Sequence, residues 1–413
     1  MTTGDVCKLR LEGIAQGGDA IGRIDGKTVF VEGGAPEETV LCRITEDRNT
    51  WAKAELLEIV EPSAVRTESV CAFYGKCAAK AASAAKAAAA KAVCGGCNLQ
   101  HINYEAQLVL KVNILKDAFE RVGCFCPAEP EVFSSPPWEY RNRMQFHCFR
   151  ELAKNSDSPK YGLKGRRSGE IIAVNDCPVA VPGIREILSF SGSRERGKGL
   201  TLPVEKDRFT VFSKDDVLLS EGGQQRGKIK LLEKEIILDA GVFFQSNCCM
   251  LEKLILQLQR IALYADRNLP MADLYCGVGT FALFLSDMFP KIILAEENKN
   301  AVSLARENLK FNRADAEFHA LRDTEWPGRI FNEKKTEFGF AVIDPPRAGL
   351  APKLSASLAK NGPPVLAYVS CDPASLARDS KILTNGYYKL NELMLFDFYP
   401  QTAHIETLAV FTR

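Results

Sequence analysis

The spacing of apolar residues differs between the two ends of the chain. In the first 60 residues, short apolar runs at 6–11, 28–31 and 39–44 are separated by glycine-rich turns. This spacing predicts the strands of a small β-barrel of oligonucleotide-binding (OB) type, or of another N-terminal β-domain. Residues 125–240 also mix short strand-like runs with turns. The N-terminal half is therefore expected to be rich in β-structure.

From about residue 250, apolar strands alternate with segments of helical period. The pattern predicts helices over 251–264, 281–288 and a stretch ending at 311, and strands over 271–275, 292–295, 340–343 and 365–369. Such β-α-β alternation implies an α/β fold with a doubly wound, mostly parallel sheet. Ligands of these sheets bind at the carboxyl ends of the strands.

These patterns predict three domains in the 413-residue chain: a barrel over 1–62, a central α+β domain over 63–240 and an α/β domain over 241–413. An Ala/Lys-rich tract over 76–93 is interpreted as an exposed insertion in the central domain. The net charge is only +1, so any nucleic acid has to be held by local basic patches. No apolar run is long enough for a membrane span, and we expect a monomeric cytoplasmic protein.

A glycine-containing turn follows the predicted strand at 271–275. The segment Asp273–Thr280 places Gly277 and Gly279 where the backbone can approach a ligand closely. The Gly-x-Gly-x-x-Gly pattern of dinucleotide sites is not met, which disfavours a pyrophosphate ligand. S-adenosylmethionine has no phosphate, its cationic groups suit an acid such as Asp273, and an acid at Glu296 or Glu297 can bind ribose hydroxyls.

Two further strands end in residues that carry chemistry. The strand at 340–343 leads into Asp344-Pro-Pro-Arg347, and the strand at 365–369 leads into Ser370-Cys371-Asp372-Pro373. A buried cysteine is more often inert, but a thiol at a strand mouth beside a cofactor site favours a nucleophile. His404 and Glu406 lie near the C-terminus, two residues apart, so on a strand they would share a face.

This set of residues fits methylation of C5 in uracil. C5 is too weak a nucleophile to take a methyl group until a thiolate has added to C6. A base must then remove the C5 proton so that elimination frees the thiol. The reaction needs one cysteine, one base and no metal, and His404 and Glu406 are the candidates for the base.

Cysteines also cluster in the central region. Cys71, Cys77, Cys94 and Cys97 precede Gln100-His101, and Cys177 follows later. Cys94-Gly-Gly-Cys97 is a tight chelating pair, and zinc or an iron–sulfur cluster would suit these thiols. Disulfides are the less favoured interpretation in a cytoplasmic chain.

In these motifs and their order the chain resembles the RNA (uracil-5-)-methyltransferases, and within that family the branch that carries a TRAM domain and a [4Fe-4S] cluster and acts on 23S rRNA. The resemblance covers nearly the whole length. It also includes Tyr140-Arg-Asn-Arg143 and Phe243-Phe-Gln245-x-Asn247. It implies a TRAM barrel, a central domain with an iron–sulfur site, and a Rossmann-like domain that binds S-adenosylmethionine.

The same resemblance implies roles for individual residues. Cys371 would be the nucleophile and Glu406 the base. The cofactor would contact Gln245, Tyr275, Glu296 and Asp344, and the cluster would be held by Cys71, Cys94, Cys97 and Cys177. The Ala/Lys tract interrupts the family's cysteine spacing, so Cys77 and Cys94 compete for one ligand position, and we favour Cys94.

Other interpretations remain open from the sequence. The RNA could be the T-loop of tRNA, although tRNA enzymes of this family generally lack the barrel and the cysteines, which favours rRNA. A cytosine-5 methylase would want a different partner than Glu406, and a non-catalytic cluster protein would not need Asp344 or Cys371. For RNA phosphates in the central domain the sequence offers Arg141, Arg143, Arg166 and Arg167.

Overall fold

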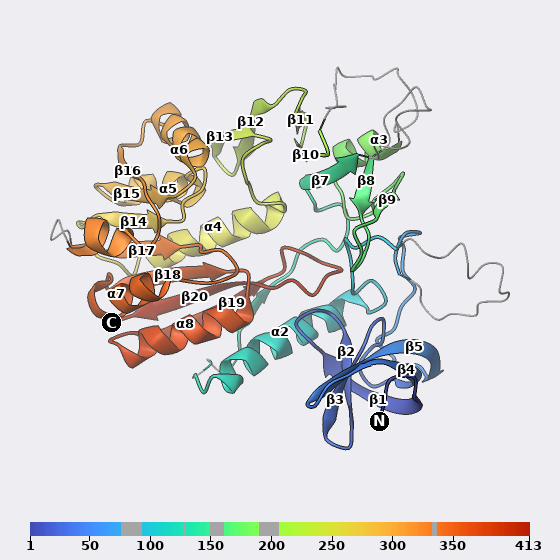
Figure 1. Ribbon diagram of the computed structural model, residues 1–413. Helices are drawn as coiled ribbons and strands as arrows, with labels where there is room; N and C mark the ends of the chain where they lie inside the picture. Colours follow the sequence, from blue (N-terminus) through green and yellow to red (C-terminus); the bar gives the residue numbers. More distant parts are fainter. Residues whose placement is uncertain (76–92, 125, 127–128, 149–160, 190–205, 333–336) are drawn as a thin grey trace.

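The computed structural model describes residues 1–75, 93–124, 126, 129–148, 161–189, 206–332 and 337–413. Its strands form a closed barrel, a five-stranded sheet, a two-stranded ribbon and an eight-stranded sheet. Figure 1 shows the eight-stranded sheet at one side of the molecule, with the barrel and the five-stranded sheet at the other. Cys77 and nearly all of the Ala/Lys tract lie outside the described residues.

The N-terminal segment folds into a closed barrel in the order β1-β2-β3-β5-β4. Alternate residues such as Leu9 and Leu11 point into the barrel and are buried, as the period of a strand requires. Gly22 faces the crossing strand so closely that a Cβ there would lie 2.5 Å from the carbonyl oxygen of Arg10. The strands are β1 (Val6–Ile14), β2 (Ala20–Ile24), β3 (Lys27–Val31), β4 (Thr39–Asp47) and β5 (Trp51–Glu61).

The central region contributes a five-stranded sheet in the order β11-β10-β7-β8-β9, joined by a ribbon of β12 and β13. A separate hydrophobic cluster around Phe146 and Phe209 packs this sheet against a short helix. The elements are β7 (Arg143–Cys148), β8 (Tyr161–Lys164), β9 (Ile171–Ala173), α3 (Pro182–Ser189), β10 (Arg208–Lys214), β11 (Val217–Ser220), β12 (Arg226–Leu231) and β13 (Lys234–Asp239).

The C-terminal segment forms the predicted α/β domain, with strand order β16-β15-β14-β17-β18-β20-β19-β6. β14 pairs in parallel with β15 and β17, and β20 is antiparallel to both neighbours. The strands are β14 (Met271–Leu274), β15 (Ile292–Glu296), β16 (Ala316–Ala320), β17 (Phe340–Ile343), β18 (Val365–Ser370), β19 (Lys389–Phe396) and β20 (Glu406–Thr412).

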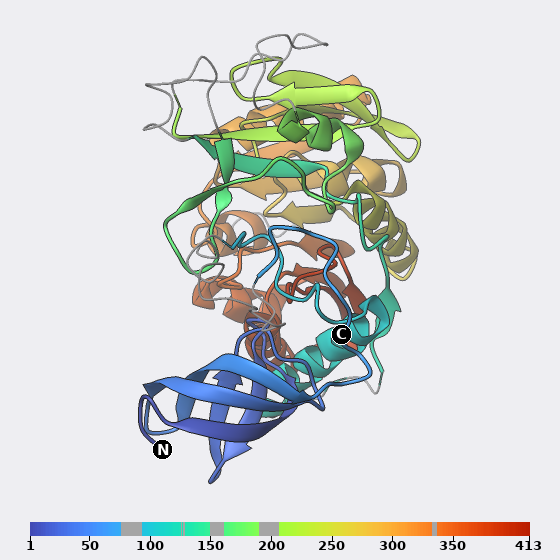
Figure 2. The ribbon, with the colours of Figure 1, turned by 90° about the vertical axis from the view of Figure 1, so that its right-hand side faces the viewer.

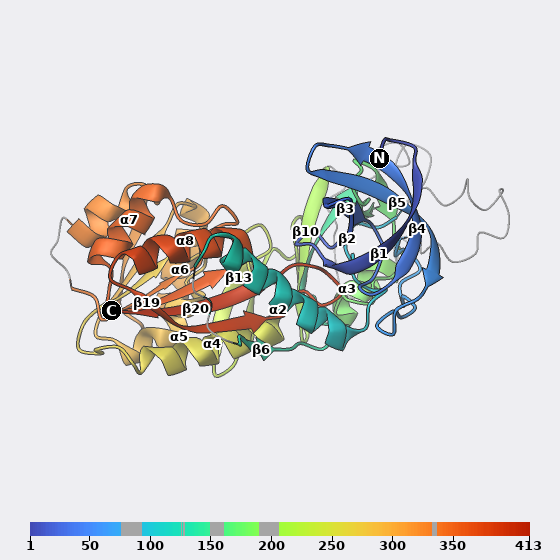
Figure 3. The same ribbon diagram turned by 90° about the horizontal axis from the view of Figure 1, so that it is seen from below.

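Helices cover both faces of this sheet (Figure 3). Alternate strand residues divide between two hydrophobic clusters: Phe340 and Val342 pack with α4, α5 and α6, while Ala341 and Ile343 pack with α7 and α8. The helices are α4 (Cys248–Ala262), α5 (Thr280–Leu285), α6 (Lys299–Phe311), α7 (Pro352–Asn361) and α8 (Pro373–Asn385), with a 3-10 turn (Ser286–Met288) and a π-helical turn (Pro327–Asn332).

Two elements from the segment assigned to the central domain belong to this sheet. The edge strand β6 (Glu131–Phe133) pairs in parallel with β19. The helix α2 (Tyr104–Arg121) lies beside α8, and its apolar residues Leu110, Ile114 and Leu115 join the same hydrophobic cluster as Leu376 and Leu383. The sequence between residues 104 and 133 thus completes the α/β domain, although it precedes the rest of that domain by more than 100 residues.

Ion pairs connect the barrel to the five-stranded sheet. Arg167 donates to Asp19 over 2.5 Å and to Glu32 over 3.0 Å, and Arg166 lies 2.8 Å from Glu32. The sequence suggested these two arginines as phosphate contacts, but in the structure their guanidinium groups are engaged by barrel carboxylates. Figure 2 shows the barrel, in blue, below the rest of the molecule.

Candidate active site

The glycine turn after β14 forms one wall of a large cavity. Tyr275, Gly277 and Gly279 all have positive φ, which folds the backbone tightly between β14 and α5. At Gly279 a Cβ would lie 3.1 Å from Cβ of Ala305, so the turn also needs glycine for helix packing. Gly277 has open space where its Cβ would be, and its N–H donates to Glu296 over 3.2 Å.

Asp273 supports this turn from below and does not line the cavity. Its carboxylate accepts a hydrogen bond of 2.9 Å from the amide of Ala282, in the first turn of α5, and the residue is completely buried. Burial raises the pKa of Asp273 to about 8. The expectation that Asp273 contacts a cationic ligand is therefore wrong. Its side chain points into the protein, where it bonds to the backbone of α5.

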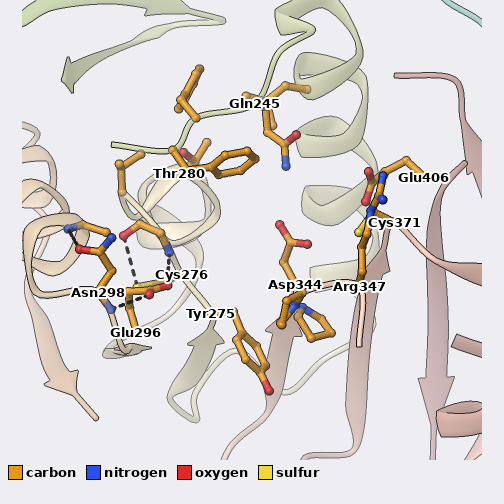
Figure 4. Close-up of a pocket in the computed structure, with 18 of the residues that line it drawn as sticks. Gln245, Tyr275, Cys276, Thr280, Glu296, Asn298, Asp344, Arg347, Cys371 and Glu406 are labelled. Carbon is orange, nitrogen blue, oxygen red and sulfur yellow. Dashed lines mark hydrogen bonds between the residues drawn. The ribbon is translucent and has the colours of Figure 1, made fainter. Parts of the chain in front are cut away.

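The cavity has a volume of about 770 Å³ and lies at the carboxyl ends of β14, β15, β17 and β18. Figure 4 shows Gln245 and Asp344 facing each other across it, with Cys371 and Glu406 beside Arg347 on one side. All six residues expected at the catalytic and cofactor positions line this one cavity: Gln245, Tyr275, Glu296, Asp344, Cys371 and Glu406.

Glu296 ends β15 and is held by two backbone amides. Its oxygens accept from Gly277 over 3.2 Å and from Asn298 over 2.8 Å. Glu297, the alternative considered from the sequence, also lines the cavity but is exposed. Glu296 is thus the acid whose position the fold fixes.

Acidic groups crowd the reactive side of the cavity. Burial and the nearby Glu296 raise the pKa of Asp344 to about 7. Burial and then Asp344 raise the pKa of Glu406 well above its ordinary value, and Arg347 opposes this. Burial, Glu406 and Asp344 raise the pKa of the Cys371 thiol to about 12, again opposed by Arg347. A cationic ligand would relieve this repulsion.

His404 and Glu406 differ in their surroundings. Glu406 is the first residue of β20 and is buried, whereas His404 lies in the preceding loop and is exposed. Arg347 donates to Nδ1 of His404 over 3.1 Å. Desolvation by the surrounding protein and the Arg347 cation lower the pKa of His404 to about 4. Both residues line the cavity, but the expected strand begins only at Glu406.

Several lining residues were not anticipated from the sequence. Asp323 accepts a hydrogen bond of 3.0 Å from the Tyr275 hydroxyl, and the ring of Trp326 packs edge-on against Tyr275. Both follow β16, a strand whose moderately apolar sequence gave no clear period; recognising it would have pointed to them. Phe243 is 59% exposed at the cavity, with the Arg143 guanidinium 5.5 Å from its ring.

The cysteines surround a second, smaller cavity of about 200 Å³. Its lining includes the four cysteines favoured as cluster ligands: Cys71, Cys94, Cys97 and Cys177. Burial raises the pKa of Cys97 to about 12 and that of Cys177 to about 11. Gly95, Gly96 and Arg141 line both cavities, so the cysteine cavity adjoins the candidate active site.

These thiols are not arranged around one point. Within the described residues, no group of three or more His, Cys, Asp or Glu side chains is close enough to hold a single metal ion. A zinc ion would require its thiolates about 2.3 Å from one centre. A four-iron cluster holds its thiolates at separate corners, farther apart, with the cluster filling the space between them.

Comparison with known proteins agrees with this architecture. Residues 226–413 match the family profile described as tRNA (Uracil-5-)-methyltransferase, and residues 2–57 match the TRAM domain. An RNA methyltransferase of Treponema denticola is 32% identical, and the match covers 94% of each chain. A protein of Aliivibrio salmonicida named 23S rRNA (uracil(1939)-C(5))-methyltransferase RlmD is 27% identical over 94% of this chain and 92% of its own.

A solved structure shares the fold along the whole chain. The tRNA (uracil-54, C5)-methyltransferase of Pyrococcus abyssi, in complex with S-adenosyl-L-homocysteine, superposes with a TM-score of 0.72 at 22% identity. The superposition covers 98% of this chain and 100% of the other. Taken with the near-full-length relatives, these findings show that the chain belongs to the RNA (uracil-5-)-methyltransferase family.

Proposed function

We propose that this enzyme transfers a methyl group from S-adenosylmethionine to C5 of a uridine in 23S rRNA, through a covalent bond between Cys371 and C6. The observation that carries the proposal is the meeting of Cys371, Glu406 and Asp344 in one cavity with the cofactor-side residues Tyr275 and Glu296. A thiol, a base and a cofactor wall are the parts that methylation at C5 requires.

The cavity suits S-adenosylmethionine by charge. The cofactor carries a sulfonium and an ammonium group, and when bound it supplies an electrophilic methyl group. Burial and the neighbouring Glu296 raise the pKa of Asp344, so a cation bound beside it would favour its ionised form. We assign Glu296 to the ribose hydroxyls, and Gln245, Tyr275 and Asp344 to the remaining cofactor contacts.

Cys371 acts first in the proposed sequence. Its thiolate adds to C6 of the uracil, which makes C5 nucleophilic, and C5 then takes the methyl group. Arg347, which stabilises negative charge at Cys371, is placed to assist the formation of the thiolate. The uridine has to be single-stranded or flipped out of a helix at a cost of a few kcal/mol, because stacking hides C6.

Glu406 acts second, as the base that removes the C5 proton so that the C6–S bond breaks. Burial raises its pKa, so its carboxylate accepts a proton more readily than an exposed one would. His404 is the weaker candidate, because its pKa of about 4 and its hydrogen bond from Arg347 both disfavour protonation. We therefore favour Glu406.

We further propose that the cysteine cavity holds a [4Fe-4S] cluster through Cys71, Cys94, Cys97 and Cys177. The donor set fits, because four thiols with a cavity between them match the chemistry of such a cluster. Burial disfavours thiolates without a metal, which also suits a site that is filled during folding.

The assignment to 23S rRNA is supported by relatives bearing that name at 27–28% identity over more than nine-tenths of this chain. The barrel does not distinguish rRNA from tRNA, because the Pyrococcus abyssi tRNA enzyme shares the full-length fold. Phe243 is exposed at the cavity and the Arg143 guanidinium lies 5.5 Å from its ring, so the two offer an aromatic face and a cation for a flipped base and its phosphate.

The covalent step is tested with RNA that contains 5-fluorouridine. In 5-fluorouridine the C5 proton is replaced by fluorine, which a base cannot remove. Methyl transfer should therefore leave the RNA bonded to Cys371 in a complex that survives denaturation. The band should require both S-adenosylmethionine and the thiol. Methylation of the RNA without any trapped complex would refute the covalent mechanism. Methyl transfer to cytosine would refute uracil as the target nucleobase.

A further inference from the structure

The loop between β19 and β20, residues 397–405, brings the C-terminal side of the active site into place. Tyr399 and His404 from this loop line the catalytic cavity, and Glu406 follows it directly as the first residue of β20. Small changes in the path of this loop would move the base relative to Cys371.

A buried ion pair holds the start of the loop. Nζ of Lys111, on helix α2, donates to Asp397 over 2.6 Å and to the carbonyl oxygen of Tyr399 over 3.1 Å. Neither charged side chain is exposed at all. Burial lowers the pKa of Lys111, and Asp397 opposes this effect. Because desolvation offsets much of the attraction in such pairs, fixed geometry is a better explanation of this one than added stability.

A buried amide holds the middle of the loop. Gln107 lies one helical turn before Lys111 on the same face of α2. It donates to the Gln401 side chain over 3.0 Å and accepts from the Gln401 backbone amide over 2.9 Å. Gln401 has φ of 67°, a conformation that costs a non-glycine residue energy and persists only when its surroundings enforce it.

Neighbouring residues extend these contacts toward the base. The Tyr140 hydroxyl donates to the carbonyl oxygen of Pro400 over 2.9 Å. Asn98 accepts from the amide of Ala403 over 2.8 Å and donates to Gly17 of the barrel. Four side chains that hold this loop therefore come from residues 98–140, and Asn247 and Arg347 add bonds to Phe398 and His404.

We propose that Gln107 and Lys111 are positioning residues for methylation: they fix the loop so that Glu406 faces the C5 proton of the Cys371-bound uracil. This inference rests on the proposed function. It assigns a catalytic consequence to helix α2, which lies outside the segment matched by the methyltransferase family profile.

Two variants test the proposal. Gln107→Met keeps the length of the side chain and removes its hydrogen bonds. The double variant Lys111→Met with Asp397→Leu removes both buried charges together, so no unpaired charge remains. Each should lower kcat on the order of 10²-fold, the effect of misplacing a catalytic group by about 1 Å. KM for RNA should change little, and methylated enzyme–RNA adduct should accumulate on ordinary RNA because elimination is slowed.

Matched controls separate positioning from folding. Tyr388→Phe removes another buried side-chain hydrogen bond, the one from the Tyr388 hydroxyl to the carbonyl oxygen of Pro363, and Tyr388 does not line the cavity. Arg260→Met with Glu392→Leu removes a different ion pair, between α4 and β19. Each folded control molecule should release product as the wild type does. Tyr140→Phe deletes only the bond to Pro400 and provides a milder test if the other variants do not fold.

The outcomes are distinct. Adduct accumulation in the Gln107 and Lys111–Asp397 variants, absent from both controls, supports the proposal. If folded variants turn over without accumulating adduct, Gln107 and Lys111 do not position the base. If neither wild type nor Glu406→Gln ever forms an adduct, the proposed covalent function itself fails, and this inference fails with it.

Discussion

The Cys371 thiol lies in surroundings that disfavour its reactive form. Burial and the carboxyl groups of Glu406 and Asp344 raise its pKa to about 12. A thiolate therefore becomes accessible only when positive charge enters the cavity or the carboxyl groups are neutral.

The first prediction separates the nucleophile from the base. Cys371→Ala should abolish turnover and every covalent adduct, because no bond to C6 can form. Glu406→Gln keeps the size of the side chain but cannot accept the proton, so turnover should fall about 10²–10⁴-fold while methylated adduct accumulates. Denaturing gels with labelled RNA measure both. Accumulation in His404→Gln, with free turnover of Glu406→Gln, would reverse the assignment of the base.

The second prediction concerns Asp344 and pH. Its pKa in the folded protein is about 7, against an ordinary value of 3.8, so the folded state binds the proton more tightly than the unfolded state. The resulting stability is complete below pH 3.8 and is lost as pH rises toward 7, by up to about 1.4 kcal/mol per unit. Asp344→Asn removes this dependence, so relative to wild type the variant should gain stability between pH 5 and pH 8.

Chemical denaturation of the cofactor-free protein at these two pH values provides the measurement. The Asp287→Asn variant is a suitable control, because Asp287 is exposed on the surface near Lys234. Parallel stability curves for wild type and Asp344→Asn would show that Asp344 ionises normally in the folded protein.

At the residue scale, the sequence predicted which residues line the cavity better than it predicted the orientation and burial of their side chains. Cys371 and Asp344 were found because acids and thiols that end parallel strands converge at one edge of the sheet. The same reasoning misplaced Asp273, since sequence does not distinguish a side chain facing the ligand from one that caps the next helix. His404 is exposed and Glu406 is buried because of segments that are distant in the sequence. A local sequence pattern cannot predict this difference in burial.

At the scale of elements, the boundaries were predicted most accurately for strands with continuous apolar sequences. The strand over 340–343 and the start of the strand at 271 were predicted correctly, because fully buried parallel strands are continuous apolar runs. β16 was missed because half-buried edge strands lack such runs. The placement of β6 beside β19 could not be predicted, since three residues carry no register information of their own.

The third prediction concerns the segment that carries the cysteines. Protein purified without oxygen should be brown and contain about four irons, the number in the proposed type of cluster. Cys97→Ser should remove the colour and the iron, because a thiolate ligand is lost. Cys249→Ser is the matched control, since Cys249 is exposed on α4 and does not line the cysteine cavity. Metal analysis and visible absorption are the measurements.

The cysteine at position 94 can be tested in the same way. Cys94 lines the cavity, whereas Cys77 lies outside the described residues. Loss of the colour in Cys77→Ser but not in Cys94→Ser would reverse our choice of ligand. Colourless protein with one bound zinc would refute the cluster.

At the scale of the whole molecule, ion pairs connect the barrel to the five-stranded sheet. With a net charge of +1, the chain has no general attraction for RNA. Arg166 and Arg167 bind barrel carboxylates, and Gln16 of the barrel donates to Asp372, next to Cys371, over 2.6 Å. The barrel therefore contacts the nucleophile's own loop. Among the described helices none is long and apolar enough to cross a membrane.

The last prediction concerns which RNA is the substrate of this enzyme. The overall fold is shared with a tRNA enzyme, so the architecture does not choose between substrates. The choice has to come from the surface around the cavity, where we propose that Phe243, with Arg143 beside its ring, contacts a flipped uridine. Our proposal of 23S rRNA rests on sequence relatives that carry this name.

Deleting the gene should therefore remove 5-methyluridine from one position in 23S rRNA and leave the tRNA T-loop modified. Mass-spectrometric mapping of both RNAs measures this. Wild-type protein should restore the rRNA modification, whereas Cys371→Ala should not, because it folds around the same cavity without the nucleophile. Loss of the modification from tRNA alone would assign the enzyme to tRNA while leaving its chemistry unchanged. Restoration by Cys371→Ala would instead remove the covalent mechanism and keep the substrate.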